Sequence, residues 1–372
     1  MVNNLCIGGV TELIKNTTPR LLYDYEISIL SLGSDISVWK DIPGIDIVCF
    51  EIDPEFNYSL PNYFQDMIIG NTIKGHYQKV IDYLIKTKPD FIHFHTLPRF
   101  LKIGTIVNKK ISCNLIFTDH SVRIAKDEYN PFIRFALSSI YRVLYNHYHL
   151  IFVSKTVEDV ALAYNFIGKN KKYQLINNGI DTKYYQCENK IYSSKNSVIF
   201  IYVSRICPGK GHLELIKSWE NIKSDIEREL WLVGPNGMAD QLQNLINISD
   251  STNIKMLGSR KDIKELLSMS DIAVFPSSKE GLPLSLLEKM AMNLPVIVSN
   301  IDELTSVIEH RKDGLIYELE NGDDLTNKMT ILLEDKNLRI KMGNQARKKI
   351  EENYSVITVV KKIRQLYNSL LK

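Results

Sequence analysis

Glu280 and Glu288 stand eight residues apart in a segment rich in glycine, proline and leucine. The apolar run before them, residues 271–275, indicates a buried strand, and an amphipathic helix is expected to begin near Leu284. The first N–H groups of a helix bind anions, and carboxylates accept hydrogen bonds from the hydroxyls of a sugar. The segment therefore suggests a site for a phosphorylated sugar, unless Glu280 is a turn residue and Glu288 a solvated helix residue. The candidate phosphate ligands are the N–H groups of Leu284, Ser285 and Leu286.

A second loop, residues 203–211, carries Arg205 and Lys210 between a buried strand and an amphipathic helix. A guanidinium donates through a planar fork and an ammonium acts as a point charge, and both suit a diphosphate. Taken alone, the loop is explained equally well as a solvated surface turn. Together with the glutamate segment it predicts one site that combines two cations with a helix N-terminus.

Short apolar runs alternate with longer amphipathic stretches along the whole chain, and this order predicts parallel sheets covered by helices on both faces. The runs that we interpret as strands are 27–32, 91–94, 115–118, 151–153, 198–203, 229–233, 254–256, 272–275 and 295–298. The stretch from Asp181 to Asn196 is polar and aperiodic, which is typical of a linker. The apolar stripe from Tyr354 to Leu371 predicts a docking helix.

Composition excludes several classes of protein. The 372 residues suffice for two domains, and a net charge of +3 argues against a dedicated nucleic-acid binder. Five scattered cysteines exclude a disulfide framework or a zinc knuckle and fit a reducing cytosol. Neither a signal peptide nor a membrane-spanning run is expected.

These motifs give the chain a resemblance to the retaining glycosyltransferases of family 4, which have the GT-B fold. The matching pieces are the Glu280…Glu288 motif, the Arg205-x4-Lys210-Gly loop, Trp231-Leu-Val-Gly-Pro, Leu257-Gly258 with Asp262-Ile263, and Asn177-Asn-Gly-Ile-Asp181. The resemblance implies an α/β chain with two doubly wound Rossmann-like domains that face a cleft. We expect an N-terminal acceptor-side domain (1–186), a nucleotide-sugar domain (187–353) and a C-terminal helix (354–372) that returns to the first domain.

The resemblance also implies roles for individual residues. Glu280 would hold the donor sugar and Glu288 the ribose, while Arg205 and Lys210 would neutralise the diphosphate in place of a metal ion. The catalytic set would be His120, Arg205, Lys210 and Glu280, and the donor-binding set would be Gly8, Gly9, Gly258, Ser259, Arg260, Gly281, Leu282, Pro283, Leu284, Ser285 and Glu288. No metal or other cofactor is expected.

Three histidines lie at predicted strand ends of the first domain. His120 matches the family histidine near the reacting sugar carbon. His93 and His95 share one side of a strand and could bind a metal, although a structural or acceptor-side role is favoured.

Two features depart from the family pattern. The strand that usually precedes the Gly8-Gly9 loop is nearly absent, so we expect a first sheet without most of its first strand. Pro283 removes one N–H from the phosphate-binding turn.

The expected activity is transfer of a hexose or N-acetylhexosamine from a nucleotide sugar, with UDP favoured, to a saccharide or lipid-linked saccharide of an O-antigen or capsule. The alternatives are a nucleotide-sugar 2-epimerase and a catalytically impaired nucleotide-sugar binder, whereas a dinucleotide oxidoreductase is disfavoured because G-x-G-x-x-G is missing.

A basic and aromatic face in the first half of the chain suggests a peripheral contact with an anionic membrane on its cytoplasmic side; the alternative is a core helix with ordinary surface charges. The residues in question are Phe132, Arg134, Phe135, Tyr141, Arg142, Tyr145, Tyr148, Lys155, Lys169, Lys171 and Lys172.

Overall fold

The computed structural model describes residues 9–31, 42, 44–50, 77–95, 100–120, 131–168, 171–187, 197–235, 253–280 and 284–371, and it divides the chain into two compact units. Unit 1 comprises residues 1–179 and 359–372, and unit 2 comprises residues 180–358. The division therefore falls at Gly179, before the polar linker stretch rather than inside it. Gly8 and the expected missing first strand lie outside the described residues.

Unit 1 contains two parallel sheets with helices around them. The smaller sheet pairs β1 (Ser28–Ser31) with β2 (Asp46–Cys49), and the larger has the order β3 (Phe91–Phe94), β4 (Asn114–Asp119), β5 (His149–Phe152), β6 (Tyr173–Leu175). The helices are α1 (Gly9–Leu21), α4 (Gln78–Thr87), α5 (Leu101–Asn108), α6 (Pro131–Tyr145), α7 (Lys155–Ala163) and the end of α15 (Val356–Leu370).

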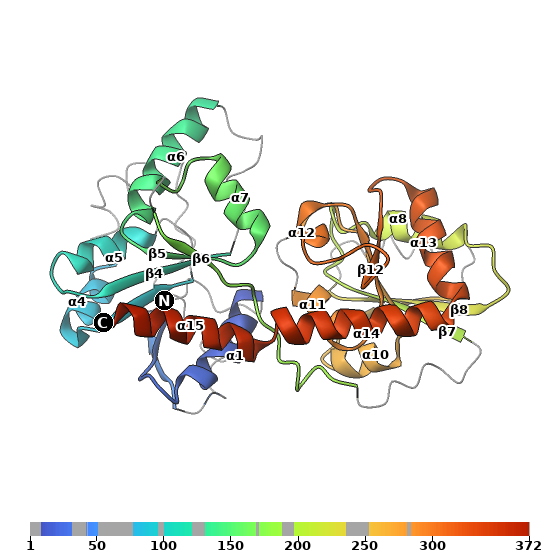
Figure 1. The fold of residues 1–372 in the computed structure, drawn as a ribbon, viewed down its shortest axis with the longest axis horizontal. Helices are drawn as coiled ribbons and strands as arrows, with labels where there is room; N and C mark the ends of the chain where they lie inside the picture. Colours follow the sequence, from blue (N-terminus) through green and yellow to red (C-terminus); the bar gives the residue numbers. More distant parts are fainter. Residues whose placement is uncertain are drawn as a thin grey trace. The chain divides into compact units, whose positions relative to one another are not determined.

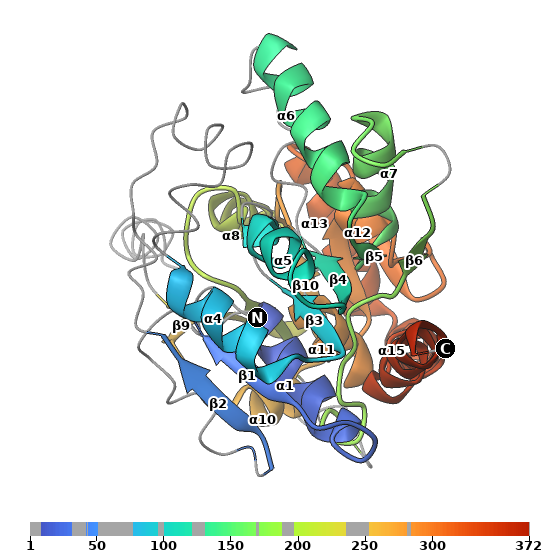
Figure 2. The same ribbon diagram turned by 90° about the vertical axis from the view of Figure 1, so that its left-hand side faces the viewer.

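The two faces of the larger sheet in unit 1 are covered by different helices (Figure 1). Because side chains alternate along a strand, Phe94 points to the face where it packs near Gly104 of α5, and His93 points to the opposite face, where it bonds Tyr367 of α15. Helices α4 and α5 pack against each other (Figure 2). Within unit 1, α15 is further held by an ion pair from Arg364 to Asp24 at 2.5 Å.

Unit 2 is built on one parallel sheet of six strands, in the order β12-β11-β10-β7-β8-β9. The strands are β7 (Ser197–Val203), β8 (Glu227–Val233), β9 (Ile254–Gly258), β10 (Ile272–Phe275), β11 (Val296–Ser299) and β12 (Gly314–Tyr317). The helices are α8 (His212–Glu220), α10 (Ile263–Met269), α11 (Leu284–Ala291), α12 (Asp302–Thr305), α13 (Gly322–Glu334) and α14 (Lys336–Asn353).

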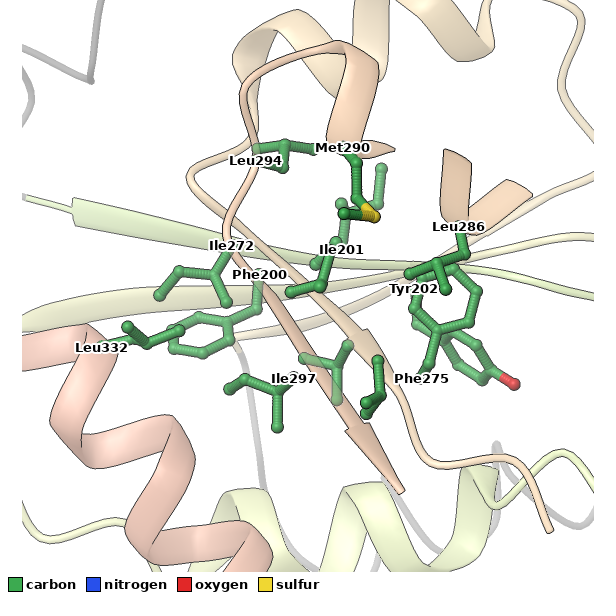
Figure 3. Packing of buried hydrophobic residues seen from close by; sticks show 14 of the residues in the cluster. Phe200, Ile201, Tyr202, Ile272, Phe275, Leu286, Met290, Leu294, Ile297 and Leu332 are labelled. Carbon is green, nitrogen blue, oxygen red and sulfur yellow. The ribbon is translucent and has the colours of Figure 1, made fainter. Parts of the chain in front are cut away.

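The core of unit 2 lies on both sides of β7 and β10. All residues of β10 are buried, and those of β7 are buried or half-buried. Figure 3 shows Leu332 of α13 beside Phe200, and Met290 of α11 on the side of Ile201. Burial on both faces explains why these strands are continuous apolar runs rather than alternating ones. A doubly wound parallel sheet is thereby confirmed in this unit.

The predicted membrane-facing surface is wrong for its three tyrosines. Tyr141, Tyr145 and Tyr148 are at most 2% exposed, because their rings pack in the core of unit 1 against Phe94, Phe117 and Phe166. Phe135 and Arg142 remain exposed on α6. Of the other members, Lys155 pairs with Glu158 and Asp159, Lys171 donates to the carbonyl of Asn146, and Lys172 is exposed. The side chains of Phe132 and Arg134 and the whole of Lys169 lie outside the described residues.

Candidate active site

The strand order of unit 2 reverses between β7 and β10. From β7 the chain moves outward through β8 to β9, and it then crosses back to β10 on the other side of β7. In open parallel sheets, ligands bind beyond the carboxyl ends of the strands at such a reversal. The loop after β7 carries Arg205 and Lys210, and the loop after β10 carries Glu280. Both motifs predicted from the sequence therefore follow the carboxyl ends of two adjacent strands.

The loop after β7 reaches the loop after β10 because two of its residues are glycine. Gly209 and Gly211 have φ values of +83° and +68°, in the left-handed region that side chains disfavour. The backbone N–H of Ser278 donates to the carbonyl of Gly209 at 3.0 Å. A Cβ at Gly211 would lie 1.9 Å from the carbonyl oxygen of Pro276. This close approach brings Lys210 to the end of β10.

We expect Gly211→Ala to lower the free energy of unfolding by about 2–5 kcal/mol, which combines left-handed strain with overpacking against Pro276. Gly258→Ala is the matched control, since Gly258 also has a positive φ, +66°, but a Cβ added there would have no atom within 4 Å. It should cost only about 1–2 kcal/mol. Urea denaturation of both variants measures the difference, and equal losses would mean that the approach to Pro276 is unimportant.

The cationic and acidic motifs meet in one ion pair. The Nζ atom of Lys210 lies 2.6 Å from Oε1 of Glu280, and the two side chains are only 16% and 11% exposed. The hydroxyl of Ser277 donates to the same carboxylate oxygen at 2.7 Å. Tyr202 contacts the hydroxyl of Ser277 at 3.0 Å and donates to the carbonyl of Lys210 at 2.8 Å. Ser277 thus holds the carboxylate of Glu280 in place, and Tyr202 holds the backbone of Lys210.

Other residues that are predicted to bind the donor come from the loop after β7 and from helix α11. Arg205 is exposed, and Glu288 is half-buried on α11. Helix α11 begins at Leu284, as the sequence predicts, with Leu284 and Ser285 half-buried at its start. The intervening residues Gly281, Leu282 and Pro283 lie outside the described residues.

The loop after β9 lies beside the loop after β8, at the carboxyl ends of these two strands. The N–H of Gly234 donates to the carbonyl of Gly258 at 2.8 Å, which ties the ends of β8 and β9 together. Ser259 and Arg260 are exposed beyond this point, and Arg260 forms a two-pronged ion pair with Asp262 at 2.7 and 2.5 Å. The Arg260 guanidinium lowers the pKa of Asp262. The predicted base-contact loop therefore presents backbone and a neutralised side-chain pair.

His212, at the start of α8, is a buried group that the sequence did not single out. Its side chain is 4% exposed, neither ring nitrogen has a hydrogen-bond partner among the described residues, and its ring lies 4.7 Å from that of Tyr202. Burial, with a smaller contribution from the charge of Lys210, lowers the pKa of His212 to about 4.

The pH dependence of stability should reflect this histidine. An unfolded histidine titrates near pH 6.5, so between about pH 6.5 and 4 the unfolded state binds more protons, and stability falls with falling pH. The loss from pH 7.5 to pH 5 should be about 2 kcal/mol for this one group. His212→Phe keeps a ring and removes the titration, so its unfolding in urea should depend less on pH by that amount. An equal pH dependence in both proteins would show that His212 is not the group responsible.

In unit 1, His120 belongs to a cluster of imidazoles at the carboxyl ends of β3 and β4. Nε2 of His120 lies 3.0 Å from Nδ1 of His95. The ring of His95 lies 4.2 Å from that of His93, whose nitrogens contact Thr118 and Tyr367 at 2.7 Å. Burial lowers the pKa of His120 to about 4 and that of His93 to about 3, so these rings are neutral at pH 7.

The histidine contacts change how His95 is interpreted. One ring donates and the other accepts in this contact, so the tautomers of His95 and His120 depend on each other. Within the described parts of the chain, no group of three or more His, Cys, Asp or Glu side chains is arranged to hold a metal ion. Gly9 begins α1 in the same unit. The alternation of His93 and His95 on one strand was visible in the sequence, but the contact of His95 with His120 required the pairing of β3 with β4.

Two family models match nearly the whole chain. "Glycosyltransferase Family 4" matches residues 7–184, and "Glycosyl transferases group 1" matches residues 188–349. The chain belongs to family 4 of the glycosyltransferases. It is therefore a retaining glycosyltransferase that uses a nucleotide sugar, and its GT-B fold follows from the two Rossmann-like units.

Relatives of this glycosyltransferase include two enzymes whose names contain an undecaprenol diphosphate acceptor. A UDP-Gal:alpha-D-GlcNAc-diphosphoundecaprenol alpha-1,3-galactosyltransferase of Escherichia coli is 32% identical over 53% of this chain and 54% of its own length. This chain thus matches about half of that protein. An N,N'-diacetylbacillosaminyl-diphospho-undecaprenol alpha-1,3-N-acetylgalactosaminyltransferase of Campylobacter jejuni is 29% identical over 64% and 65%. An N-acetyl-alpha-D-glucosaminyl L-malate synthase of Bacillus anthracis is 27% identical over 97% and 93%.

Solved structures match the glycosyltransferase over its full length. A glycosyltransferase from Rickettsia africae has a TM-score of 0.80 at 20% identity and covers 100% of this chain and 97% of its own. HepE of Anabaena, solved with UDP, has a TM-score of 0.80 at 17% identity and covers 99% and 98%. At these identities the likeness shows the fold.

Proposed function

We propose that this glycosyltransferase moves a hexose or N-acetylhexosamine from a UDP-sugar to a hydroxyl of a saccharide or lipid-linked saccharide in surface polysaccharide synthesis. The observation that carries the proposal is the ion pair of Lys210 and Glu280 at the reversal of the strand order in unit 2. The galactosyl- and N-acetylgalactosaminyltransferases among its relatives, whose names include lipid diphosphate acceptors, support the substrate class.

The diphosphate would be held by Lys210, Arg205 and the start of α11. The ammonium of Lys210 has three N–H groups, of which one bonds Glu280 and one makes a long contact of 3.4 Å with the carbonyl of Lys279. A further N–H is therefore available for a phosphate oxygen. Charge that builds on the leaving diphosphate would be stabilised by these fixed donors, as in other sites preorganised for a developing anion.

Glu280 would bind the sugar through its second carboxylate oxygen. Oε1 already accepts from Lys210 and Ser277, so its position is fixed by two hydrogen bonds. The bond from the anomeric carbon to the diphosphate breaks while the acceptor oxygen bonds the same face of that carbon. The acceptor proton passes to an oxygen of the leaving diphosphate, which keeps the configuration and needs no carboxylate nucleophile. Glu288 would hold the ribose.

A lipid-linked acceptor would bring the enzyme to a membrane surface. Phe135 and Arg142 on α6 are exposed residues of the predicted face that remain available for such a contact, and Lys172 is a further one. None of the helices in the described ranges has the length and apolar character that crossing a bilayer requires.

Incubation with UDP-galactose, UDP-N-acetylgalactosamine, UDP-glucose or UDP-N-acetylglucosamine and a lipid diphosphate saccharide tests the proposal. We expect a transfer product in which the anomeric configuration of the donor is kept. Epimerised donor would favour the 2-epimerase instead, and donor binding without turnover would favour a non-catalytic binder.

Thermal unfolding with UDP, GDP and ADP tests the base. A ligand at one hundred times its Kd stabilises the folded state by about 2.7 kcal/mol, and we expect this shift from UDP and smaller shifts from the purine nucleotides. A larger shift with GDP or ADP would correct the donor base and leave the transfer reaction in place.

A further inference from the structure

Lys289 is a fully buried lysine in unit 2 whose place the core packing does not explain. Its side chain is 0% exposed on α11, between Glu288 and the core residue Met290. Taking an ammonium out of water costs several kcal/mol unless other groups compensate. An apolar side chain would fill this position at lower cost, so the charge suggests a role.

The ammonium lies between the end of β10 and the first turn of α11. Its Nζ atom donates to the carbonyl of Ser285 at 2.8 Å and lies 4.9 Å from the ring centroid of Phe275. Ser285 belongs to the turn whose N–H groups are proposed to hold the diphosphate, and Phe275 is the last residue of the strand that leads to Glu280. Lys289 is therefore a cation beneath the proposed diphosphate site.

Opposing effects act on the charge of Lys289. Burial lowers its pKa to about 8, while the carboxylates of Glu288 on the same helix and Glu280 in the loop after β10 favour the ammonium.

Neighbouring elements contribute the other charged groups in this region. Lys210, from the loop after β7, is paired with Glu280. Glu303 of α12 and Glu280 act on each other. Arg347 of α14 bonds the carbonyl of Ala291 at the opposite end of α11.

We propose that Lys289 is a third cation of the donor site, which takes up a proton when a nucleoside diphosphate binds. The inference rests on the proposed function, because it requires the diphosphate to lie at the start of α11. The added negative charge would favour the ammonium form of a lysine that water does not reach. Lys289 acts through space and is a positioning residue rather than a catalytic one.

Isothermal titration calorimetry of the full chain with UDP at pH 8, in two buffers of different ionisation enthalpy, tests this proposal. We expect uptake of about half a proton, since a lysine with a pKa near 8 is then half protonated. The phosphates of UDP are fully ionised at this pH and contribute no uptake, because the last pKa of such a group is about 6. Binding by wild-type enzyme without proton uptake overturns the proposal.

Two variants assign the proton to Lys289. Lys289→Met should abolish the uptake and raise Kd by up to about tenfold. Lys289→Arg stays charged at pH 8, so it should bind without proton uptake and with a Kd close to that of the wild type. Cys207→Ser is the control for the only thiol in the loop after β7, and it should leave the uptake unchanged. Uptake that persists in Lys289→Met overturns the assignment.

Failure of the inference and failure of the proposed function give different results. If UDP, GDP and ADP all fail to bind, the proposed donor site is wrong and this inference falls with it. If one of them binds and no proton is taken up, only the role of Lys289 is wrong. The wild-type measurement decides between these results even if both Lys289 variants fold poorly.

Discussion

Lys210→Met should lower kcat by a factor of about 10²–10³ while the enzyme remains folded. The ammonium is 16% exposed and fixed by Glu280, so it is a preorganised donor in a site with little water. Removing one such donor to a developing anion costs about 2.7–4 kcal/mol of transition-state stabilisation. Methionine keeps most of the apolar stem and removes the charge. Initial rates with donor and acceptor both saturating measure the effect.

Lys217→Met is the matched control for Lys210, since Lys217 is an exposed lysine on the following helix α8. It should leave kcat within about twofold of the wild type, because substitutions of this kind at the surface change little. Near-normal turnover of Lys210→Met at saturation would remove Lys210 from the reaction and with it the metal-free account of the leaving group.

Glu280→Gln should lower kcat/KM by roughly 10- to 100-fold. The substitution keeps the size of the side chain and leaves an acceptor for Ser277, but it removes the charge that faces Lys210. A hydrogen bond to a charged group is worth about 1.5–3 kcal/mol, which gives this range. The effect should appear with every donor sugar that the enzyme accepts.

The combination of Lys210→Met with Glu280→Gln tests whether the two residues act as a pair. We expect the double variant to lose less activity than the sum of the two single losses, since contacting residues couple by about 0.5–3 kcal/mol. Strict additivity would show that the ion pair has no part in catalysis. Glu220→Gln, at the exposed end of α8, is the control for the loss of one carboxylate.

Most strands could be predicted because burial on both faces leaves a continuous apolar run in the sequence. β7 and β10 are examples, and their observed bounds agree with the predicted runs within a residue or two at each end. The strands missed by the sequence, β2, β6 and β12, have three or four residues each, and all three lie at the edge of their sheets among the described strands. The side chains of β2 and β6 are half-buried or exposed, whereas those of β12 are mostly buried. A short edge strand gains its structure from its neighbour rather than from its own pattern.

The buried tyrosines of α6 and of the turn that follows it show the opposite error. A helix with many aromatic residues and several basic ones is compatible with a membrane surface and with a core. Which of these holds depends on the neighbouring rings of Phe94, Phe117 and Phe166, which come from distant parts of the chain.

The sequence by itself determined the alternation of strands and helices, the family, and the two loops that carry Lys210 and Glu280, because these depend on local residue types and spacing. Only the tertiary structure decided that the two side chains form one pair, that His95 contacts His120, and that Lys289 of α11 is fully buried. The physical reason is that strand order and burial are set by packing among many segments. Distance and charge in a site follow from that packing, whereas the sequence of a loop fixes only which groups are available.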